Sequence, residues 1–325
     1  MIKFLVIRFS SIGDIVLTSP VVRIIKQQIP DSVVHFLTKQ EYSSIVSNNK
    51  NIDKIHLLSK ENLLEIIQKL KYEHYDYIID LHNNIRTYKI KSKLKVPDFT
   101  FDKLNYKKWI YVNFKKNLLT NIHIVDRYLQ TLSVFNIKND NLGLDFFIHK
   151  NDKINLSKYL ENNEKFISIV IGAKHFTKKM PNNIIVDLIN KLNYKVVLLG
   201  GKDDVDNANE IINNCKREII NFCGKLNINE SASVLQQSTI VISHDTGLMH
   251  IASALKKDII SIWGNTVPEF GMYPYLPGKK SKIFQVEGLK CRPCSKIGFK
   301  KCPKNHFNCM QLLNIKDISE YINNI

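Results

Sequence analysis

The 325-residue sequence lacks any run of about 18 consecutive apolar residues, the length that a helix needs to cross a bilayer. The apolar opening stretch, residues 1–9, is too short for the hydrophobic region of a secretory signal with its cleavage site, and it runs directly into a polar turn. We therefore expect a cytoplasmic protein without a transmembrane helix.

Arginine is scarce although the chain is strongly basic. Of 47 lysine and arginine residues only six are arginine, and the formal net charge is +17. Because specific phosphate recognition usually relies on the planar guanidinium group, we expect no specific nucleic-acid partner. The lysine excess fits compositional drift, and it equally fits attraction to an acidic membrane surface or an anionic substrate.

Cysteine is infrequent, and four of the six cysteines fall within a short stretch near the C-terminus. In a cytoplasmic chain this number argues against a disulfide framework. A C-x₂-C pair followed by two further cysteines fits a structural zinc clip, and it also fits a group of reduced, partly buried thiols. The four residues are Cys291, Cys294, Cys302 and Cys309.

Strand-like and helix-like segments alternate through both halves of the chain. Apolar runs typical of buried strands occur at residues 3–9, 33–37, 77–81, 166–171, 195–199, 239–243 and 258–263. Their alternation with helical patterns predicts an α/β fold with parallel sheets. We expect two Rossmann-like lobes: residues 1–152, and residues 153–325 with the Cys-rich tail. Residues 89–116 show a weaker pattern, which we interpret as the irregular end of the first lobe.

Polar residues follow the first strand, where an open parallel sheet binds its ligands. Here Ser10 and Gly13 precede Asp14 in a turn that leads into a helix. Gly13 would permit a close backbone approach or a positive φ. Asp14 is a candidate functional carboxylate, although it could simply favour the helix N-terminus electrostatically. The segment lacks a full G-x-G-x-x-G pattern, so we do not expect a dinucleotide site here.

Two later strand ends also carry candidate ligand-binding residues. Lys178 and Lys179 precede a helix that begins near Pro181, where a phosphate could bind, although a solvated basic loop would look the same. After the strand at 239–243 the chain reads Ser-His-Asp-Thr-Gly-Leu-Met-His. In this run a helix N-terminus could bind a diphosphate. Its candidate residues are Asp245, Thr246, Gly247, Leu248 and His250.

These motifs, taken together, resemble glycosyltransferase family 9, the ADP-heptose:lipopolysaccharide heptosyltransferases. The opening stretch 3–20 is similar to the start of that family, and residues 243–250 are similar to its second hallmark. Residues 177–181 resemble its middle motif, with Met180 where a tryptophan is more usual. The Cys-rich tail is closest to heptosyltransferase II-like members.

The resemblance implies a GT-B fold, in which two lobes face one another across a cleft, and an inverting transfer of heptose from ADP-heptose to the lipopolysaccharide inner core. Asp14 would be the general base, with Ser10 and Gly13 beside the acceptor. Lys178 would neutralise the donor diphosphate, Asp245 would bind the donor sugar, and the remaining donor contacts would come from Thr246, Gly247, Leu248 and His250. No metal or other cofactor would be required. The acceptor would be a lipopolysaccharide core precursor, and peripheral contact with the inner membrane is expected.

Two other interpretations remain open at this point. The chain could be another two-lobed sugar-nucleotide enzyme, either a glycosyltransferase with a different donor or an epimerase. Its charge also fits a basic protein that binds nucleic acid or a membrane surface without catalysis. The motifs do not distinguish the acceptor sugar or which heptose addition is made.

Overall fold

The computed structural model describes residues 1–59, 63–162 and 164–325, which form two compact units. The first unit comprises Met1–Leu104 and Ile122–Phe147, and the second comprises Asn105–Asn121 and Ile148–Ile325. By its contacts, the short segment Asn105–Asn121 therefore belongs with the later part of the chain. A domain boundary after residue 152 remains a prediction from the sequence.

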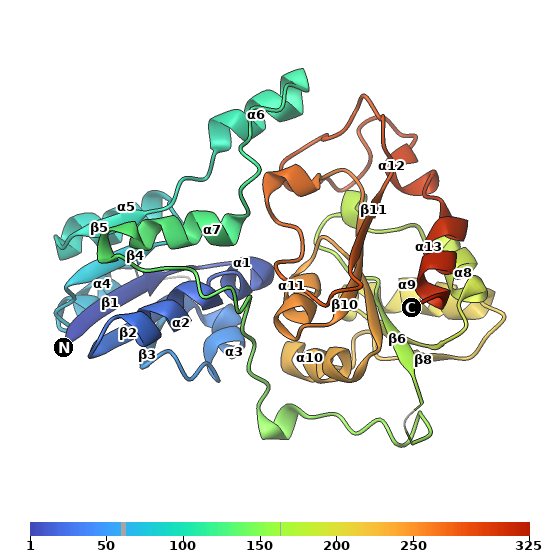
Figure 1. Cartoon of the computed structure of the whole chain (residues 1–325), viewed down its shortest axis with the longest axis horizontal. Coiled ribbons are helices and arrows are strands. Elements are labelled where there is room, and N and C mark those ends of the chain that lie inside the picture. Colours follow the sequence, from blue (N-terminus) through green and yellow to red (C-terminus); the bar gives the residue numbers. More distant parts are fainter. Residues whose placement is uncertain (60–62, 163) are drawn as a thin grey trace. The chain divides into compact units, whose positions relative to one another are not determined.

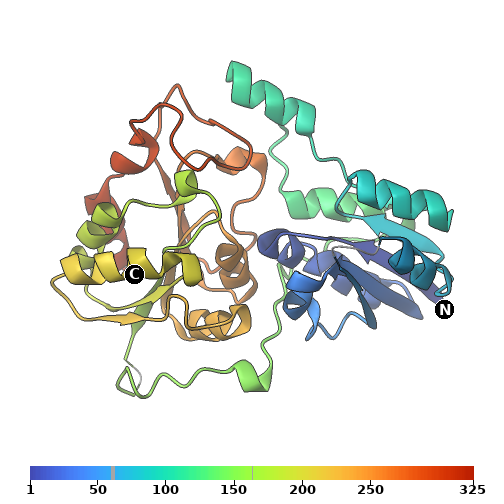
Figure 2. The ribbon, with the colours of Figure 1, turned by 180° about the vertical axis from the view of Figure 1, so that it is seen from behind.

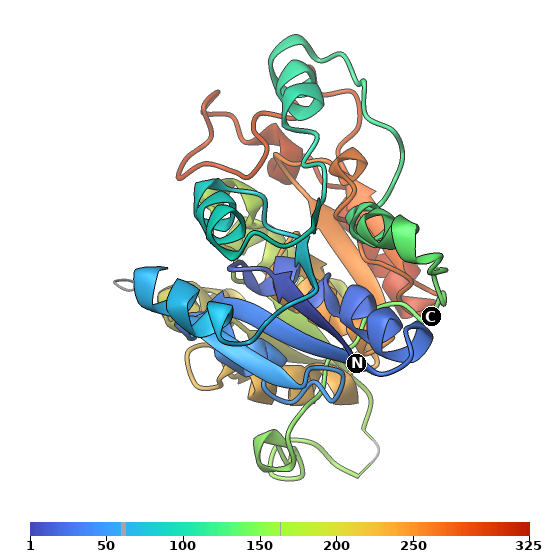
Figure 3. The same cartoon turned by 90° about the vertical axis from the view of Figure 1, so that its left-hand side faces the viewer.

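The first unit is built on a 5-stranded parallel sheet with the strand order β3-β2-β1-β4-β5, which can be followed in Figures 1 and 3. The expected strands at 3–9, 33–37 and 77–81 are confirmed as β1, β2 and β4. The strands are β1 (Ile2–Ile7), β2 (Ser32–Lys39), β3 (Lys54–Leu58), β4 (Tyr77–Asp80) and β5 (Asp98–Thr100).

Helices cover both faces of this sheet because its central strand is apolar on both sides. Leu5 and Ile7 of β1 pack against α4 and α5, whereas Phe4 points the other way and meets the ring of Phe135. The helices are α1 (Ile12–Val16), α2 (Ser19–Gln28), α3 (Ser43–Val46), α4 (Leu63–Lys71), α5 (Ile85–Leu94) and α7 (Ile124–Leu129), with short 3₁₀ turns at η1 (Gln40–Tyr42) and η2 (Gln130–Phe135).

The second unit contains a 6-stranded parallel sheet with the order β11-β10-β9-β6-β7-β8, seen from two sides in Figures 1 and 2. The strands expected at 166–171, 195–199, 239–243 and 258–263 are confirmed as β6, β7, β9 and β10. The strands are β6 (Phe166–Val170), β7 (Lys195–Leu199), β8 (Ile219–Asn221), β9 (Ile240–His244), β10 (Asp258–Trp263) and β11 (Lys282–Gln285).

A hydrophobic core joins this second sheet to α8, α9, α12 and α13. Ile185 and Leu188 of α8 and Ile318 of α13 pack with Ile169 of β6. The helices are α6 (Asn105–Phe114), α8 (Asn182–Lys191), α9 (Val205–Asn214), α10 (Ile228–Gln237), α11 (Gly247–Ala254), α12 (Asn308–Gln311) and α13 (Ile315–Asn323), with 3₁₀ turns at η3 (Lys150–Asp152), η4 (Phe176–Lys178), η5 (Lys202–Asp204) and η6 (Pro268–Phe270).

The expectation of irregular structure at residues 89–116 is wrong. This stretch contains most of α5, the edge strand β5 and all of α6. Its helical pattern is weak because few of its side chains reach a core: α5 buries only Thr87 and Ile90, and α6 buries none. Within the described residues, none of the helices combines the length and apolar character needed to span a membrane.

Candidate functional site

The candidate residues lie where the strand order of each sheet reverses. This reversal occurs between β1 and β4 in the first unit and between β6 and β9 in the second. Open parallel sheets bind ligands beyond the carboxyl ends of their strands at such points. Asp14 follows β1, Lys178 follows β6 and Asp245 follows β9, so each stands at the position that the topology favours.

Asp14 is held by groups on three sides. It is the third residue of α1, and its Oδ2 atom accepts hydrogen bonds from the Ser11 amide at 3.0 Å and the Ser11 hydroxyl at 2.7 Å. Its Oδ1 atom forms an ion pair with Arg8 Nη2 at 2.6 Å. The Asp14 side chain is 19% exposed, so a ligand can reach it. The arrangement holds an ionised, oriented carboxylate at the end of β1.

Arg8 is the partner of Asp14, and no separate role was predicted for it. Its side chain is only 8% exposed, and it donates from Nε to Ser10 O at 2.8 Å and from Nη1 to Leu81 O. Burial by itself would lower the pKa of Arg8, but Asp14 opposes this effect and the pKa lies above its usual value. An arginine directly after the buried run of β1 is the signal in the sequence that could have indicated such a role.

Ser10 and Gly13 lie beside Asp14 as the sequence predicts. Ser10 contributes its carbonyl to Arg8, and Gly13 is the buried second residue of α1. Gly13 is not among the glycines with positive φ, so that conformation is not the reason for glycine at this position. Contact of either residue with an acceptor remains a prediction.

In the second unit the structure brings Lys178 and Asp245 together. Lys178 Nζ lies 2.6 Å from Asp245 Oδ2, although the two residues are 67 positions apart in the sequence. The Thr266 hydroxyl donates to the same oxygen at 3.0 Å. Lys178 is 17% exposed and Asp245 is 10% exposed, so the pair is sheltered but reachable. Because β6 and β9 are adjacent strands, their carboxyl ends place this cation and carboxylate side by side.

The segment that carries Lys178 is fixed by three contacts that sequence reasoning missed. His244 Nε2 accepts a hydrogen bond from the Met180 amide at 2.9 Å, and Lys179 Nζ pairs with Asp204 Oδ1 at 2.5 Å. The Thr177 hydroxyl accepts from the Phe299 amide at 2.8 Å. Burial, together with the nearby Lys179 charge, lowers the pKa of His244 to about 4, so its ring is neutral and can accept.

Helix α11 begins at Gly247, with Thr246 as its N-cap. The Thr246 side chain makes no capping bond and instead lies 3.3 Å from the Ser243 hydroxyl. Gly247 and Leu248 form the partly exposed first turn, where backbone amides can bind an anion. His250, by contrast, is 2% exposed and lies on the buried side of the helix. Its assignment to the donor remains a prediction.

A hollow of about 460 Å³ opens in the second unit near the ends of β10 and β11. Its lining mixes Tyr111, Lys115, Glu269 and Arg292, a combination suited to a polar, hydroxyl-rich ligand. Arg292 donates to Gln285 Oε1 and to Thr266 O, each at 2.9 Å. The hollow is therefore connected, through Thr266, to the Lys178–Asp245 pair.

The Cys-rich tail forms a loop with free thiols. Cys294 Sγ donates to Cys291 O at 3.0 Å, and burial with the neighbouring Cys291 raises the pKa of Cys294 to about 11. Burial raises the pKa of Cys309 to about 12. Among the described residues, the atoms that lie close enough to share one metal ion belong to a different group, in the first unit. A zinc clip at the cysteines stays a prediction.

Comparison with known proteins identifies the relatives of this chain. The family model of glycosyltransferase family 9 (heptosyltransferase) matches residues 63–303. Lipopolysaccharide heptosyltransferase 3 of Escherichia coli K12 is 24% identical over 282 residues, which cover 78% of this chain and 80% of the relative.

Two solved structures share the fold along nearly the whole chain. E. coli ADP-heptose lps heptosyltransferase II aligns with a TM-score of 0.75 at 18% identity, covering 99% of this chain and 98% of that one. E. coli heptosyltransferase WaaC with ADP aligns with a TM-score of 0.71 at 17% identity, covering 99% of each chain. The predicted GT-B type architecture, with two Rossmann-like parallel sheets, is confirmed.

Proposed function

Because the chain belongs to glycosyltransferase family 9 (heptosyltransferase), we propose that it transfers heptose from ADP-heptose to the inner core of lipopolysaccharide. The observation that carries this proposal is the family match over residues 63–303, which includes the Lys178–Asp245 pair at the strand reversal of the second sheet. Asp14 lies outside the matched range, and its role rests on its geometry and on the similarity of the opening motif.

The second unit supplies the groups for a nucleotide-sugar donor. Lys178 and the first-turn amides of α11, at Gly247 and Leu248, provide positive charge for the two phosphates. Asp245 uses Oδ2 for Lys178 and Thr266, and its other oxygen is the candidate acceptor for a sugar hydroxyl. These groups stabilise the leaving ADP as it gains charge, so we infer that no metal or other cofactor is required.

Asp14 is the proposed general base. The acceptor hydroxyl gives its proton to the Asp14 carboxylate while its oxygen bonds to the anomeric carbon of heptose. The bond from that carbon to the diphosphate oxygen breaks, and ADP leaves with the electron pair. Attack from the side opposite the leaving group inverts the anomeric configuration. Arg8 and Ser11 fix the carboxylate before substrate arrives, which limits the reorganisation needed in the reaction.

Helix α6 supports contact with the cytoplasmic face of the inner membrane. On one side, Tyr111 packs on Phe270, and Lys115 donates to Pro293 O at 2.7 Å. The other side presents Tyr106, Trp109 and Phe114, which are 73%, 50% and 67% exposed, and the Trp109 ring contacts the other two rings. Exposed aromatic rings among lysines are typical of segments that bind an anionic membrane interface.

A transfer assay tests the reaction and its base together. Purified protein, ADP-heptose and a lipopolysaccharide core precursor should yield ADP and an acceptor that has gained one heptose, detected by mass spectrometry. Asp14→Asn should keep its circular dichroism spectrum and lose activity about 100-fold or more, as expected when a general base is removed. Asp31→Asn, which changes an exposed carboxylate of the same unit, is the matched control and should retain full activity.

Two results would contradict specific parts of the proposal. Near-wild-type transfer by Asp14→Asn would show that another group is the base. Stronger binding of UDP than of ADP by calorimetry would reject the ADP-heptose donor and favour a different sugar-nucleotide enzyme.

A further inference from the structure

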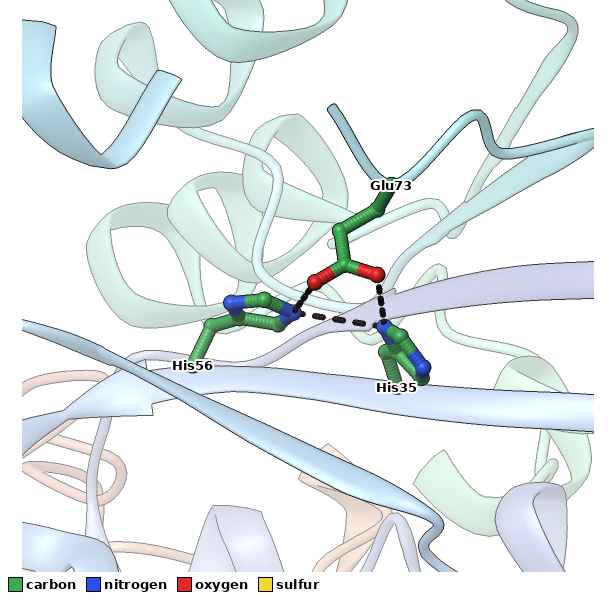
Figure 4. Close-up of side chains that lie close together, drawn as sticks. All are labelled: His35, His56 and Glu73. Atoms are coloured by element: carbon green, nitrogen blue, oxygen red, sulfur yellow. Dashed lines mark hydrogen bonds and ion pairs between the residues drawn. The ribbon is translucent and has the colours of Figure 1, made fainter. Parts of the chain in front are cut away.

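A second cluster of chemically active side chains lies in the first unit, away from Asp14. His35 comes from β2, His56 from β3, and Glu73 from the turn between α4 and β4 (Figure 4). Because Glu73 precedes β4, it stands near the amino end of that strand, whereas Asp14 follows the carboxyl end of β1. The parallel register pairs His56 with Leu37, two positions beyond His35, so both histidines project from the same face of the sheet.

The distances between these three side chains match a tetrahedral metal site. His35 Nδ1 lies 3.3 Å from His56 Nε2. The two nitrogens lie 3.7 Å from the Glu73 oxygens, Oε2 for His35 and Oε1 for His56. Zinc bonds of about 2.1 Å at tetrahedral angles would hold their ligand atoms about 3.4 Å apart. The side chains therefore need only small movements to bind an ion.

The environment also suits metal binding. Both histidine side chains are 6% exposed, and burial lowers the pKa of each, to about 4 for His56. A neutral imidazole offers the lone pair that a metal requires. The Tyr75 hydroxyl lies 3.0 Å from His35 Nδ1 and 3.0 Å from His56 Nε2, next to both nitrogens.

The main obstacle to a cation is the pair of lysines at Glu73. Lys54 Nζ lies 2.5 Å from Oε1, and Lys3 Nζ lies 3.6 Å from Oε2. Lys54 is 55% exposed, so it can turn into solvent when an ion takes its place. An exposed ion pair of this kind is weak, and a metal bond exceeds it. Lys54 thus competes with the ion and reduces its affinity.

We propose that His35, His56 and Glu73 bind one zinc ion, with Tyr75 beside the fourth position. Nitrogen ligands disfavour magnesium and calcium, and the near-tetrahedral spacing favours zinc among the transition metals. The ion joins β2, β3 and the turn before β4 at the amino end of the sheet, and its role is to stabilise the first unit. The site does not depend on the proposed heptosyl transfer.

Zinc titration of chelator-treated full-length protein tests the site, with a chromophoric chelator as competitor. We expect the wild type to bind one zinc ion per chain. His35→Gln and His56→Gln should each bind zinc at least about tenfold more weakly. His149→Gln, which changes an exposed histidine, is the matched control and should bind as the wild type does. Unchanged affinity in both histidine variants would overturn the proposal.

Three further measurements separate this site from the cysteines and from a purely hydrogen-bonded network. Cobalt(II) bound here should show visible bands without intense thiolate charge-transfer absorption, and Cys294→Ser/Cys302→Ser should still bind zinc. Loss of zinc binding in the cysteine variant, together with strong thiolate bands in the wild type, would assign the metal to the tail and overturn the proposal. Lys54→Gln should bind zinc several-fold more tightly; equal or weaker binding would contradict competition by Lys54. This variant leaves all three ligands in place, so its result does not depend on whether the histidine variants fold.

Discussion

Asp14 is fixed before any substrate arrives, because Ser11 and Arg8 occupy defined sides of its carboxylate. A base held in this way loses little orientational entropy in the reaction. Arg8 is itself fixed by two backbone carbonyls, so the direction of Asp14 depends on the end of β1 and on the chain after β4.

In the second unit, Gly264 helps to position the segment that carries Lys178. A Cβ atom at this position would lie 2.8 Å from Thr177 O, a backbone atom, and 2.6 Å from Met310 Cε. Gly264→Ala should therefore displace the segment that carries Lys178. We expect ADP binding to weaken and the free energy of unfolding to fall by about 1–3 kcal/mol, measured by calorimetry and urea titration.

Gly201→Ala is the control for that substitution. An added Cβ there would meet only Asp204 Oδ2, at an ordinary 3.7 Å. This variant should match the wild type in both measurements. If Gly264→Ala did the same, the contact between Gly264 and Thr177 would not position the donor site.

At the level of single residues, the sequence could predict which positions follow strands but not what they touch. Asp14, Lys178 and Asp245 were predictable because a strand pattern ends just before each of them. The Lys178–Asp245 pair was not, because it depends on β6 and β9 being neighbours, and strand order is not encoded in local periodicity. His35, His56 and Glu73 escaped notice for the same reason.

Among the elements, the segment around η4 is notable because short-range structure alone would not hold it. It consists of one 3₁₀ turn whose position depends on Thr177, Lys179 and the Met180 amide. The contact from Met180 to His244 joins this segment directly to β9. Movement of one should therefore move the other, and with it the spacing between Lys178 and Asp245.

The His244 contact predicts a pH dependence of stability. Its folded-state pKa of about 4 lies below the usual 6.5, so the unfolded chain binds the proton more readily. The contribution of neutral His244 to the free energy of unfolding is complete above pH 6.5 and is lost as the pH falls toward 4. Between pH 7 and pH 5 we expect it to lower the free energy of unfolding by about 2 kcal/mol, measured by urea titration.

His244→Gln provides the comparison, because a glutamine oxygen can accept from Met180 but does not titrate. The difference in the free energy of unfolding between the wild type and this variant should shrink or reverse as the pH falls. A difference that stays constant from pH 7 to pH 5 would show that His244 is protonated in the folded state as easily as in the unfolded state.

Elements with a buried face were predicted well, and elements without one were not. The strands β1, β6 and β9 consist mostly of buried apolar residues and were expected almost at their observed bounds. Helix α6 was missed because none of its side chains is buried, so its sequence has no clear helical spacing of apolar residues. The short strands β5 and β11 are half-exposed edges and gave equally little signal.

For the whole molecule, the charge of +17 and the aromatic side of α6 predict binding to anionic bilayers. Vesicles that contain phosphatidylglycerol should bind the protein and shift its tryptophan emission to shorter wavelength. Of the two tryptophans, Trp263 is 1% exposed, so the shift reports Trp109. Tyr106→Ser/Phe114→Ser should weaken sedimentation with these vesicles by about tenfold or more.

Tyr72→Ser/Tyr88→Ser removes two equally exposed aromatic rings elsewhere and should bind vesicles normally. Binding should also decline as salt is raised, because lysine attraction to the lipid headgroups is screened. An equal loss of vesicle binding in both double variants, or equal binding of the wild type to neutral phosphatidylcholine vesicles, would exclude α6 as the membrane-binding element.

The assignment of Asn105–Asn121 to the second unit has a consequence for synthesis on the ribosome. Its partners Phe270, Pro293 and Lys296 are translated roughly 10–30 s after it, at ordinary elongation rates. During that interval the nascent chain carries a helix whose docking surface has not yet been made. We expect chaperones and proteases to meet this stretch before the ribosome reaches the stop codon, and a pause in translation after residue 121 would lengthen that exposure.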